Sequence, residues 1–385
     1  MSKKIYENLN YTQDDKVILL AYERRLKLLE NYRSLKSIDI KEDKIKIGDI
    51  GFSNEGLITG GKSGDQVYGV NTIVKNNDKP EHRYLFKKMV LKIFKKKNKR
   101  HFREIYNQIM FQSFFSKPES ESERNRLFPM FDRIPCPKVY LQGKTDDGYF
   151  LLMENVMDNV YNFELEEYII NISNSKENLC IQKYPPDSTE SLPNPYIIEY
   201  DIIENIFLQL FNIIKEMITN DKIVYNHCDI HPRNVIVNRG EVKLIDFGES
   251  RNLIKKTNKT FNACDKDREA AMIMNKIFST KTKNFLDKNF KGKLSFLSIL
   301  KNEFKSFFIK DNVGRVDLRF LHMNLYLYLL LSDNIHKVKE EIKNLKKKIN
   351  SFNPLNKYDK ILSEIETLIK NIFDNLKSPV NTSEV

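Results

Sequence analysis

The middle of the chain carries oxygen-bearing side chains just before and just after a short apolar hairpin. The apolar runs 235–237 and 242–245 are joined by NRGE at 238–241, and Asn and Gly suit the positive φ angles of a tight turn. Such a hairpin would bring Asn234, just before its first strand, beside Asp246, just after its second. Carboxylate and amide oxygens suit Mg²⁺, particularly when the phosphates of a substrate complete the coordination shell. We therefore expect Asn234 and Asp246 to hold Mg²⁺.

A third candidate, Asp229, lies five residues before Asn234 on an irregular loop. Because metal binding does not need this extra acid, its carboxylate is available as a base or an orienting group. The run HCDIHPRN, which contains both residues, resembles the H-x-D-x-x-x-x-N catalytic loop of the protein-kinase-like superfamily, and the triplet 246–248 resembles its D-F-G. Both motifs occur in the family's order, after a long amphipathic helix expected at 202–218. The resemblance implies that Asp229 orients the acceptor hydroxyl and accepts its proton.

The resemblance also implies an ATP-binding lysine upstream, on a strand of V-A-I-K type. Lys92 in MVLKIF fits this pattern, with apolar residues on both sides, and Lys88 on the same strand is the alternative. Glu104, on the helix expected next, is placed to pair with Lys92. The run LLMENV resembles the strand that leads into the hinge, so the backbone from Glu154 to Val156 would hydrogen-bond adenine.

A glycine-rich segment precedes the lysine strand and is expected to contact the phosphates of ATP. Backbone N–H groups of a turn of small residues can cover phosphates, although the spacing does not reproduce the family's G-x-G-x-x-G in register. The overlapping run 56–63, GLITGGKS, satisfies the P-loop pattern G-x-x-x-x-G-K-[ST]. A P-loop must continue as a helix, whereas the alternating, β-branched residues that follow indicate a strand, so we expect this match to be accidental. The glycines expected at the phosphates are Gly60, Gly61 and Gly64.

The catalytic loop departs from that of conventional protein kinases. Cys228 stands where those enzymes carry Arg, and His231 stands where Ser/Thr kinases carry Lys. HCDIHPRN is at least as similar to the H-G-D-x-H-P-x-N loop of aminoglycoside- and choline-kinase-like phosphotransferases. No A-P-E triplet follows the D-F-G at the family's distance, and Asp267 resembles the aspartate that braces the catalytic loop. The D-F-G and the glutamate-bearing helix also resemble compact, divergent protein kinases of large DNA viruses, which leaves a viral source open.

The elements that position these residues predict an α+β protein with the bilobal protein-kinase-like fold. That fold has a small antiparallel β lobe with one helix, expected at about 99–115, and a large helical lobe. The last segment is charged and heptad-like, with a break expected near Pro354. The expected domains are a helical extension (1–45), the small lobe (46–156), the large lobe (157–334, with an irregular insertion at 157–200) and a helical tail (335–385).

Composition indicates a soluble intracellular protein. The chain of 385 residues has no apolar run that could span a bilayer and no secretory signal at its start. Its net charge of +12, from 64 Lys and Arg against 52 Asp and Glu, is spread along a chain rich in Lys, Asn and Ile, as in A/T-rich genomes. We therefore expect neither a nucleic-acid nor a membrane partner. The four cysteines include no C-x-x-C pair, which predicts free thiols rather than a disulfide framework or a zinc site.

These patterns together predict an ATP- and Mg²⁺-dependent phosphotransferase. The first expectation is a serine/threonine protein kinase that transfers the γ-phosphoryl group of ATP to a protein hydroxyl. The alternative is a small-molecule hydroxyl kinase of the aminoglycoside- or choline-kinase type, favoured by His231-Pro232 and the missing A-P-E. A catalytically silent scaffold comes third, because such a protein has no physical need to keep metal ligands.

Overall fold

Two compact units make up the chain, Met1–Asn159 and Val160–Val385, here called unit 1 and unit 2. The boundary expected after Val156 lies close to this division. The computed structural model describes residues 38–60, 65–75, 84–95, 99–115, 134–157, 162–168, 195–219, 223–254, 317–325, 335–352 and 358–377, apart from single positions within these ranges.

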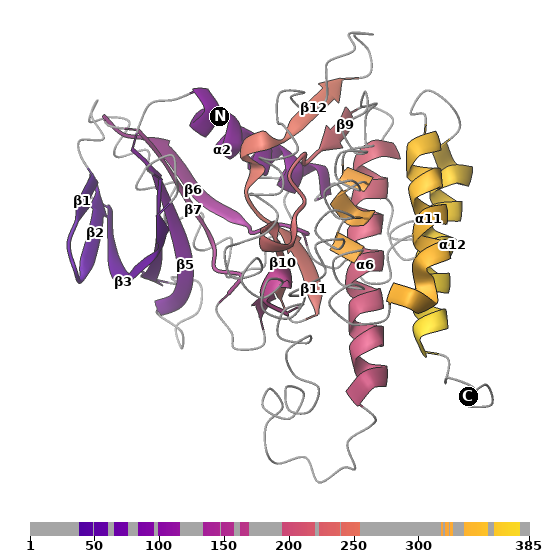
Figure 1. Ribbon diagram of the computed structural model, residues 1–385. Helices are drawn as coiled ribbons and strands as arrows, with labels where there is room; N and C mark the ends of the chain where they lie inside the picture. The colour runs from indigo at the N-terminus through magenta and orange to yellow at the C-terminus, as the bar shows by residue number, and fades with distance from the viewer. Residues whose placement is uncertain are drawn as a thin grey trace, which may run out of the picture. The chain divides into compact units, whose positions relative to one another are not determined.

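Unit 1 contains a seven-stranded antiparallel sheet in the order β1-β2-β3-β4-β5-β7-β6 (Figure 1). Its strands alternate between the core and solvent, as in β2, where Ile45 and Ile47 are buried and Lys44 and Lys46 are exposed. This alternation is typical of an antiparallel sheet with one covered face. The strands are β1 (Ile38–Ile40), β2 (Lys44–Ile47), β3 (Ile50–Gly60), β4 (Gln66–Lys75), β5 (Tyr84–Phe94), β6 (Val139–Lys144) and β7 (Tyr149–Glu154).

The P-loop alternative fails on the element that follows the glycines. A P-loop must lead into a helix, but the run 56–63 is followed by β4, which pairs antiparallel with β3. Gly56 lies within β3 at a register shift, with φ of +108°, and its N–H donates to Oδ1 of Asn54 at 2.9 Å. Glycine adopts this backbone conformation at little cost. The first glycine of the apparent P-loop therefore belongs to a bulged strand.

Helix α2 (Lys99–Phe115) packs against the sheet of unit 1. Ile105 and Ile109, four residues apart, lie on one face of the helix and are buried. The bounds of β5 and α2 confirm the strand predicted through MVLKIF and the helix predicted at about 99–115. The apolar cluster beneath the helix is completed by Phe94, Val139 and Leu151.

The buried face of α2 also carries polar side chains. Nε2 of Gln108 donates to the carbonyl of Pro137 at 3.2 Å, and Oε1 of Gln112 accepts from the N–H of Val139 at 3.0 Å. Both acceptor and donor lie at the start of β6 or just before it. Because buried backbone groups need partners, these two glutamines fix the helix along its length and do not face solvent.

Two predicted boundaries are wrong. The helical extension was expected to reach residue 45, but Ile38–Ile40 and Lys44–Ile47 are strands that pair with each other. Their isoleucines alternate with charged residues, which is the period of a strand. The insertion 157–200 was expected to be irregular throughout, but α6 begins at Pro195 within it. Proline is favoured in the first turn of a helix, because its missing N–H is not needed there.

Unit 2 is built around α6 (Pro195–Thr219) and two small antiparallel sheets. One sheet has the order β11-β10-β8 and contains the predicted hairpin, and the other pairs β12 with β9. Helical residues within 317–325 are buried against this part of the unit. The elements are β8 (Phe163–Glu164), β9 (Ile223–Asn226), η2 (Pro232–Asn234), β10 (Val235–Asn238), β11 (Glu241–Leu244), η3 (Phe247–Glu249) and β12 (Arg251–Ile254).

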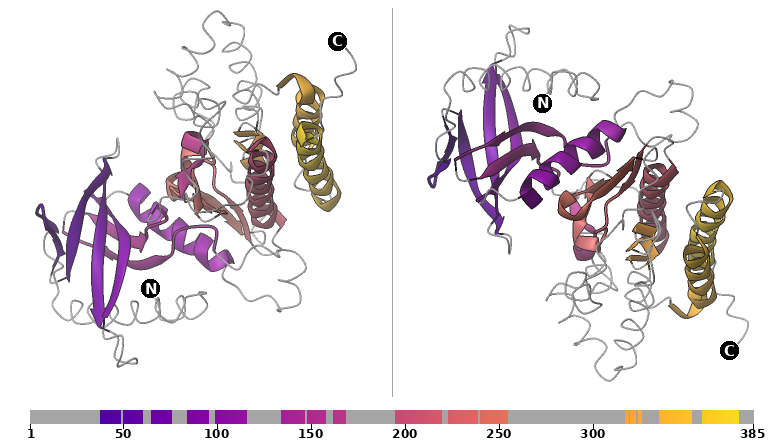
Figure 2. Two further views of the ribbon diagram at one scale, coloured as in Figure 1. Left: turned by 90° about the horizontal axis from the view of Figure 1, so that it is seen from below. Right: turned by 90° about the horizontal axis from the view of Figure 1, so that it is seen from above.

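The tail forms two helices, α11 (Ile335–Ser351) and α12 (Tyr358–Lys377), with the break near Pro354 that the sequence predicts. The two helices lie side by side, and α12 packs along α6 (Figure 2). The rings of Phe207 on α6 and Phe373 on α12 stack with centroids 6.1 Å apart. An apolar face on each helix therefore joins the tail to the core of unit 2.

Within the described helices, none combines the length and the apolar character that crossing a bilayer requires.

Candidate functional site

Unit 1 holds the predicted lysine–glutamate pair. Lys92 lies on β5 between Val67 of β4 and Leu151 of β7, and its ammonium forms an ion pair with Oε1 of Glu104 on α2. The two side chains are only 15% and 7% exposed. Charges held this far from water need partners, so the pair fixes the position of the Lys92 ammonium.

The contacts of Lys92 distinguish it from Lys88, the alternative lysine on β5. The Lys92 ammonium lies 5.0 Å from the centroid of the Phe94 ring, a cation–π contact. Lys88, four residues earlier on β5, is exposed and pairs with Asn71 of β4. Of the two lysines that the sequence offered, Lys92 is the one paired with Glu104.

The predicted nucleotide-contacting residues of unit 1 fall into two groups. Gly60 is the last residue of β3 and pairs with Gln66, while Gly61 and Gly64 lie outside the described residues. Glu154 ends β7, and its N–H donates to the carbonyl of Lys138 at 2.8 Å. A hydrogen bond from the Glu154 backbone to a ligand would therefore have to use its carbonyl. Val156 follows in a turn and is buried.

In unit 2, the hairpin brings Asn234 and Asp246 together as predicted. Val235 pairs with Leu244, and the N–H of Ile245 donates to the carbonyl of Asn234 at 3.0 Å. Asp246 follows Ile245 directly. At the other end of the hairpin, Gly240 has φ of +82°, as the turn requires. Asn238, expected in the turn, instead ends β10 and pairs with Glu241.

The Asn234 side chain is oriented by the loop that precedes it. Its Nδ2 donates to the carbonyl of Asp229 at 3.0 Å, so its Oδ1 is the side-chain atom left to accept or to coordinate. Asp246 has φ of +62° in the left-handed region, and its Oδ1 accepts from the N–H of Gly248 at 3.3 Å. A non-glycine residue in this conformation is strained, and such strain is frequent at ligand sites.

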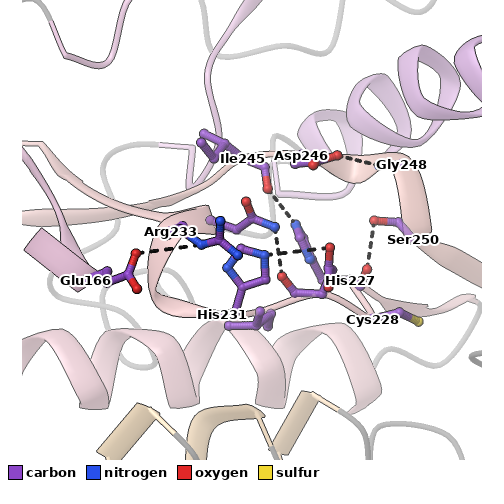
Figure 3. A network of polar contacts seen from close by, with 12 residues as sticks. Glu166, His227, Cys228, His231, Arg233, Ile245, Asp246, Gly248 and Ser250 are labelled. Atoms are coloured by element: carbon purple, nitrogen blue, oxygen red, sulfur yellow. Dashed lines mark hydrogen bonds and ion pairs between the residues drawn. The ribbon is translucent and has the colours of Figure 1, made fainter. Parts of the chain in front are cut away.

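His227 links the loop 227–234, here called the catalytic loop after its predicted role, to the residue before Asp246. Its Nε2 lies 3.1 Å from the carbonyl of Ile245 (Figure 3). Its ring meets that of Phe247 edge-on, with ring centroids 4.9 Å apart. Complete burial lowers the pKa of His227 to about 4, although the charges of Asp229 and Asp246 act in the opposite direction. The neutral ring therefore donates from Nε2 to Ile245, a structural role rather than a reactive one.

Two side chains from the segment 317–325 hold the backbone of the catalytic loop. The carboxylate of Asp317 accepts from the N–H of His227 at 2.7 Å and from the N–H of Cys228 at 2.8 Å. Nδ2 of Asn324 donates to the carbonyl of Ile230 at 3.3 Å. Both side chains are fully buried, so the loop is braced from beneath by groups distant in sequence.

A glutamine of α6 secures the hairpin in the same way. Nε2 of Gln209 donates to the carbonyl of Gly240 at 2.8 Å, and its Oε1 accepts from the N–H of Val242 at 2.9 Å. One buried side chain thus satisfies a donor and an acceptor of the turn. This contact sets the turn end of the hairpin whose open end carries Asn234 and Asp246.

Sequence reasoning missed these bracing residues. Asp267, expected to brace the catalytic loop, lies outside the described residues, and Asp317 makes the bracing hydrogen bonds. The partners of Asp317 and Gln209 are backbone groups, which leave no side-chain motif to search for. For Asn324 and Gln209, the available signal is a polar residue inside an otherwise apolar helical run.

Two further residues of the loop, His231 and Arg233, each lie near a carboxylate. Nε2 of His231 is 3.9 Å from Oδ2 of Asp229, and both residues are buried. Nε of Arg233 is 3.7 Å from a carboxylate oxygen of Glu166, which follows β8 (Figure 3). The Arg233 side chain is about one-third exposed and the Glu166 side chain is buried. The Asp229 carboxylate thus lies beside the His231 ring, and the Arg233 guanidinium lies beside Glu166.

The cysteine prediction is wrong at Cys228. Cys136 is a buried free thiol, as expected, but Cys228 is disulfide-bonded, and its partner lies outside the described residues. The Sγ of Cys228 also lies 3.8 Å from the carbonyl oxygen of Asn226, as a van der Waals neighbour. The sequence contains no close cysteine pair, so a bridge between distant cysteines gave no local signal.

The predicted ligands Asn234 and Asp246 fit Mg²⁺ only when a substrate supplies further oxygen ligands. Among the described residues, no group of three or more His, Cys, Asp or Glu side chains could hold a metal ion. Asn234 and Asp246 supply one amide and one carboxylate, and Mg²⁺ is commonly held by one or two such side chains together with substrate phosphates. The residues therefore fit Mg²⁺ delivered with a nucleotide and do not form a cage of their own.

Comparison of the chain with protein-family models and with curated proteins finds no match. The structure supports a mixed α+β class with a seven-stranded antiparallel sheet and several helices.

Proposed function

We propose that the chain is an ATP-dependent phosphotransferase with a bilobal protein-kinase-like fold. The observation that carries the proposal is the hydrogen-bonded loop of unit 2, in which Asn234 Nδ2 binds the carbonyl of Asp229 and the N–H of Ile245 binds the carbonyl of Asn234. These hydrogen bonds orient the Asn234 amide and hold its backbone beside Ile245, the residue that precedes Asp246. The buried Lys92–Glu104 pair of unit 1 supplies the cationic group that a phosphate ligand needs.

The residues have distinct roles in this reaction. Asp229 orients the acceptor hydroxyl and accepts its proton, and Lys92, held by Glu104, binds the α- and β-phosphates of ATP. Asn234 and Asp246 would hold Mg²⁺, which neutralises charge on the phosphates. Phosphoryl transfer depends chiefly on such positioning and electrostatic stabilisation. The glycine-rich segment that begins at Gly60 would cover the phosphates, and the backbone from Glu154 to Val156 would contact adenine.

A protein Ser/Thr hydroxyl is the acceptor we propose first. The order of the elements supports it: a β-rich unit with the lysine–glutamate pair precedes a unit with the catalytic loop and D-F-G. A small-molecule hydroxyl is the second candidate, and one observation favours it. Cys228 has φ of +63°, and the aminoglycoside- and choline-kinase-like loop carries glycine there, which adopts this conformation readily.

Transfer of label from [γ-³²P]ATP tests the proposal and separates the acceptors. The purified chain is incubated with Mg²⁺ and ATP, with casein in one arm and with a panel of amino alcohols and sugars in the other. We expect phosphoserine or phosphothreonine on protein, and Asp229→Asn should abolish it. Label on a small molecule alone would support the second candidate. Failure of the chain to bind ATP or transfer label in any arm would contradict the phosphotransferase proposal.

A further inference from the structure

A second buried contact with a carboxylate lies one helical turn before Glu104. Nε2 of His101, in the first turn of α2, lies 3.3 Å from Oδ1 of Asp65. The two residues are 3% and 7% exposed. A carboxylate removed from water is costly unless a donor or a positive charge faces it. The contact with His101 therefore contributes more to the stability of unit 1 than an ion pair on the surface would.

Asp65 holds a defined position in the sheet of unit 1. It directly precedes β4, whose first residue, Gln66, pairs with Gly60 at the end of β3 and with Ile93 on β5. Asp65 is thus the first described residue after the glycine-rich segment. A contact made by Asp65 therefore constrains the start of β4.

His101 connects this position to the ion pair. His101 and Glu104 are three residues apart on α2, a spacing that places two side chains on one face of a helix. The His101 ring lies 5.0 Å from the Phe94 ring, and the Lys92 ammonium lies 5.0 Å from the same ring. One turn of α2 therefore contacts the start of β4 through His101 and the middle of the sheet through Glu104.

We propose that His101 and Asp65 are positioning residues that couple the start of β4 to the Lys92–Glu104 ion pair. The inference rests on the proposed function, in which Lys92 binds the phosphates of ATP. Loss of the contact loosens the first turn of α2 from β4, so that Glu104 holds the Lys92 ammonium less firmly. The result is weaker ATP binding at a lysine that is itself unchanged.

The experiment distinguishes two roles of the His101–Asp65 contact: positioning of the Lys92–Glu104 ion pair, or stabilisation of the fold alone. Asp65→Ala, His101→Ala and the double variant are prepared in the full chain, with Arg103→Ala as the matched control. Arg103 lies on the same turn of α2, and its side chain is exposed. The first measurement is the rate at which an amine-acylating reagent labels Lys92, followed by peptide mass spectrometry below the unfolding transition. The second is the KM for ATP, with kcat, in the phosphotransfer assay.

We expect both single variants to label Lys92 several-fold faster than the wild-type chain, and the double variant to label it no faster than either single, because both remove the same contact. For ATP, kcat/KM should fall about tenfold or more, mainly through KM, while Arg103→Ala stays at the wild-type value. Asp65→Asn keeps an oxygen that can accept from Nε2 of His101 and should label Lys92 more slowly than Asp65→Ala.

Failure of the coupling and failure of the proposed function give different results. If the variants lower only the melting temperature, with Lys92 labelling and the KM for ATP unchanged, the coupling is overturned and the contact is structural. If the wild-type chain transfers no phosphoryl group, the proposed function fails, and the labelling rates of Lys92 still decide the coupling. Additive effects of Asp65→Ala and His101→Ala on labelling also overturn it.

Discussion

Oδ1 of Asp317 accepts a hydrogen bond from the N–H of Cys228 at 2.8 Å, while Cys228 sits in the left-handed region with φ of +63°. A second oxygen of the same carboxylate binds the N–H of His227. Two successive buried N–H groups directed at one carboxylate fix the backbone immediately before Asp229. The conformation of the catalytic loop thus depends on a side chain almost ninety residues away.

Replacing Asp317 with Ala should destabilise unit 2 strongly. The change leaves two buried N–H groups without their acceptor, which costs about 2–5 kcal/mol in the free energy of unfolding. Urea unfolding followed by circular dichroism measures this cost. Ser363→Ala, at an exposed position of α12, is the control and should change the free energy little. A cost for Asp317→Ala as small as that of the control would show that the bracing is not needed.

Lys92→Met should abolish phosphotransfer, because it removes the cation that we propose for the phosphates. Lys88→Met is the matched control on the same strand, since its side chain is exposed. Glu104→Gln should lower kcat/KM for ATP by about tenfold or more, because the ammonium is then less firmly positioned. Steady-state kinetics with ATP measure these effects. Equal losses for Lys88→Met and Lys92→Met would argue against the assignment of Lys92.

Asp246→Asn should raise the Mg²⁺ concentration needed for half-maximal ATP binding, because the variant loses the only carboxylate of the proposed ligand pair. Asn234→Ala should act in the same direction and should also loosen the loop, since Nδ2 of Asn234 holds the carbonyl of Asp229. Titration of Mg²⁺ at fixed nucleotide, followed by calorimetry, measures the shift. An unchanged Mg²⁺ dependence in Asp246→Asn would remove the proposed metal role.

The burial of His227 predicts that stability falls on acidification. Its pKa is about 4 in the folded chain and about 6.5 when unfolded, so the unfolded state takes up the proton first. The contribution to stability is fully present above about pH 6.5, declines as pH falls towards 4 and amounts to about 3 kcal/mol. Chemical unfolding at several pH values, with EDTA and without nucleotide, measures it. His227→Gln should flatten the slope in this window, and an unchanged slope would contradict the assignment.

The two described cysteines should differ in alkylation. In denaturant without reductant, iodoacetamide should modify Cys136, a free thiol, but not Cys228, which is disulfide-bonded. After reduction, both should be modified, and peptide mass spectrometry distinguishes the two conditions. Modification of Cys228 before reduction would show that the bridge does not form under the conditions of purification.

Local patterns in the sequence predicted the elements that depend on neighbours in the chain. The alternation of β5, the spacing of Ile105 and Ile109 on α2 and the turn at Gly240 are all readable within about a dozen residues. The juxtaposition of Asn234 with Asp246 followed from the hairpin alone. These features are local because the hydrogen bonds that define them join residues close in sequence.

Features that depend on distant partners could not be read in this way. Asp317 contacts backbone N–H groups, so no side-chain pattern marks it, and the choice of Asp267 rested on its place in the chain. The polar residues His101, Gln108 and Gln112 indicate a solvent-facing side of a helix, yet all three are buried. Strands as short as Ile38–Ile40 gave a weaker signal than the helical pattern preceding them.

The packing of α12 on α6 has a consequence for how the protein is made. The face of α6 that carries Phe207 is translated well before Phe373, the residue that stacks on it. On a nascent chain that still lacks α12, the apolar face of α6 is therefore exposed. Exposed apolar surface of this kind favours chaperone binding or aggregation. Coverage of that face has to wait until α12, the last of the described helices, has been synthesised.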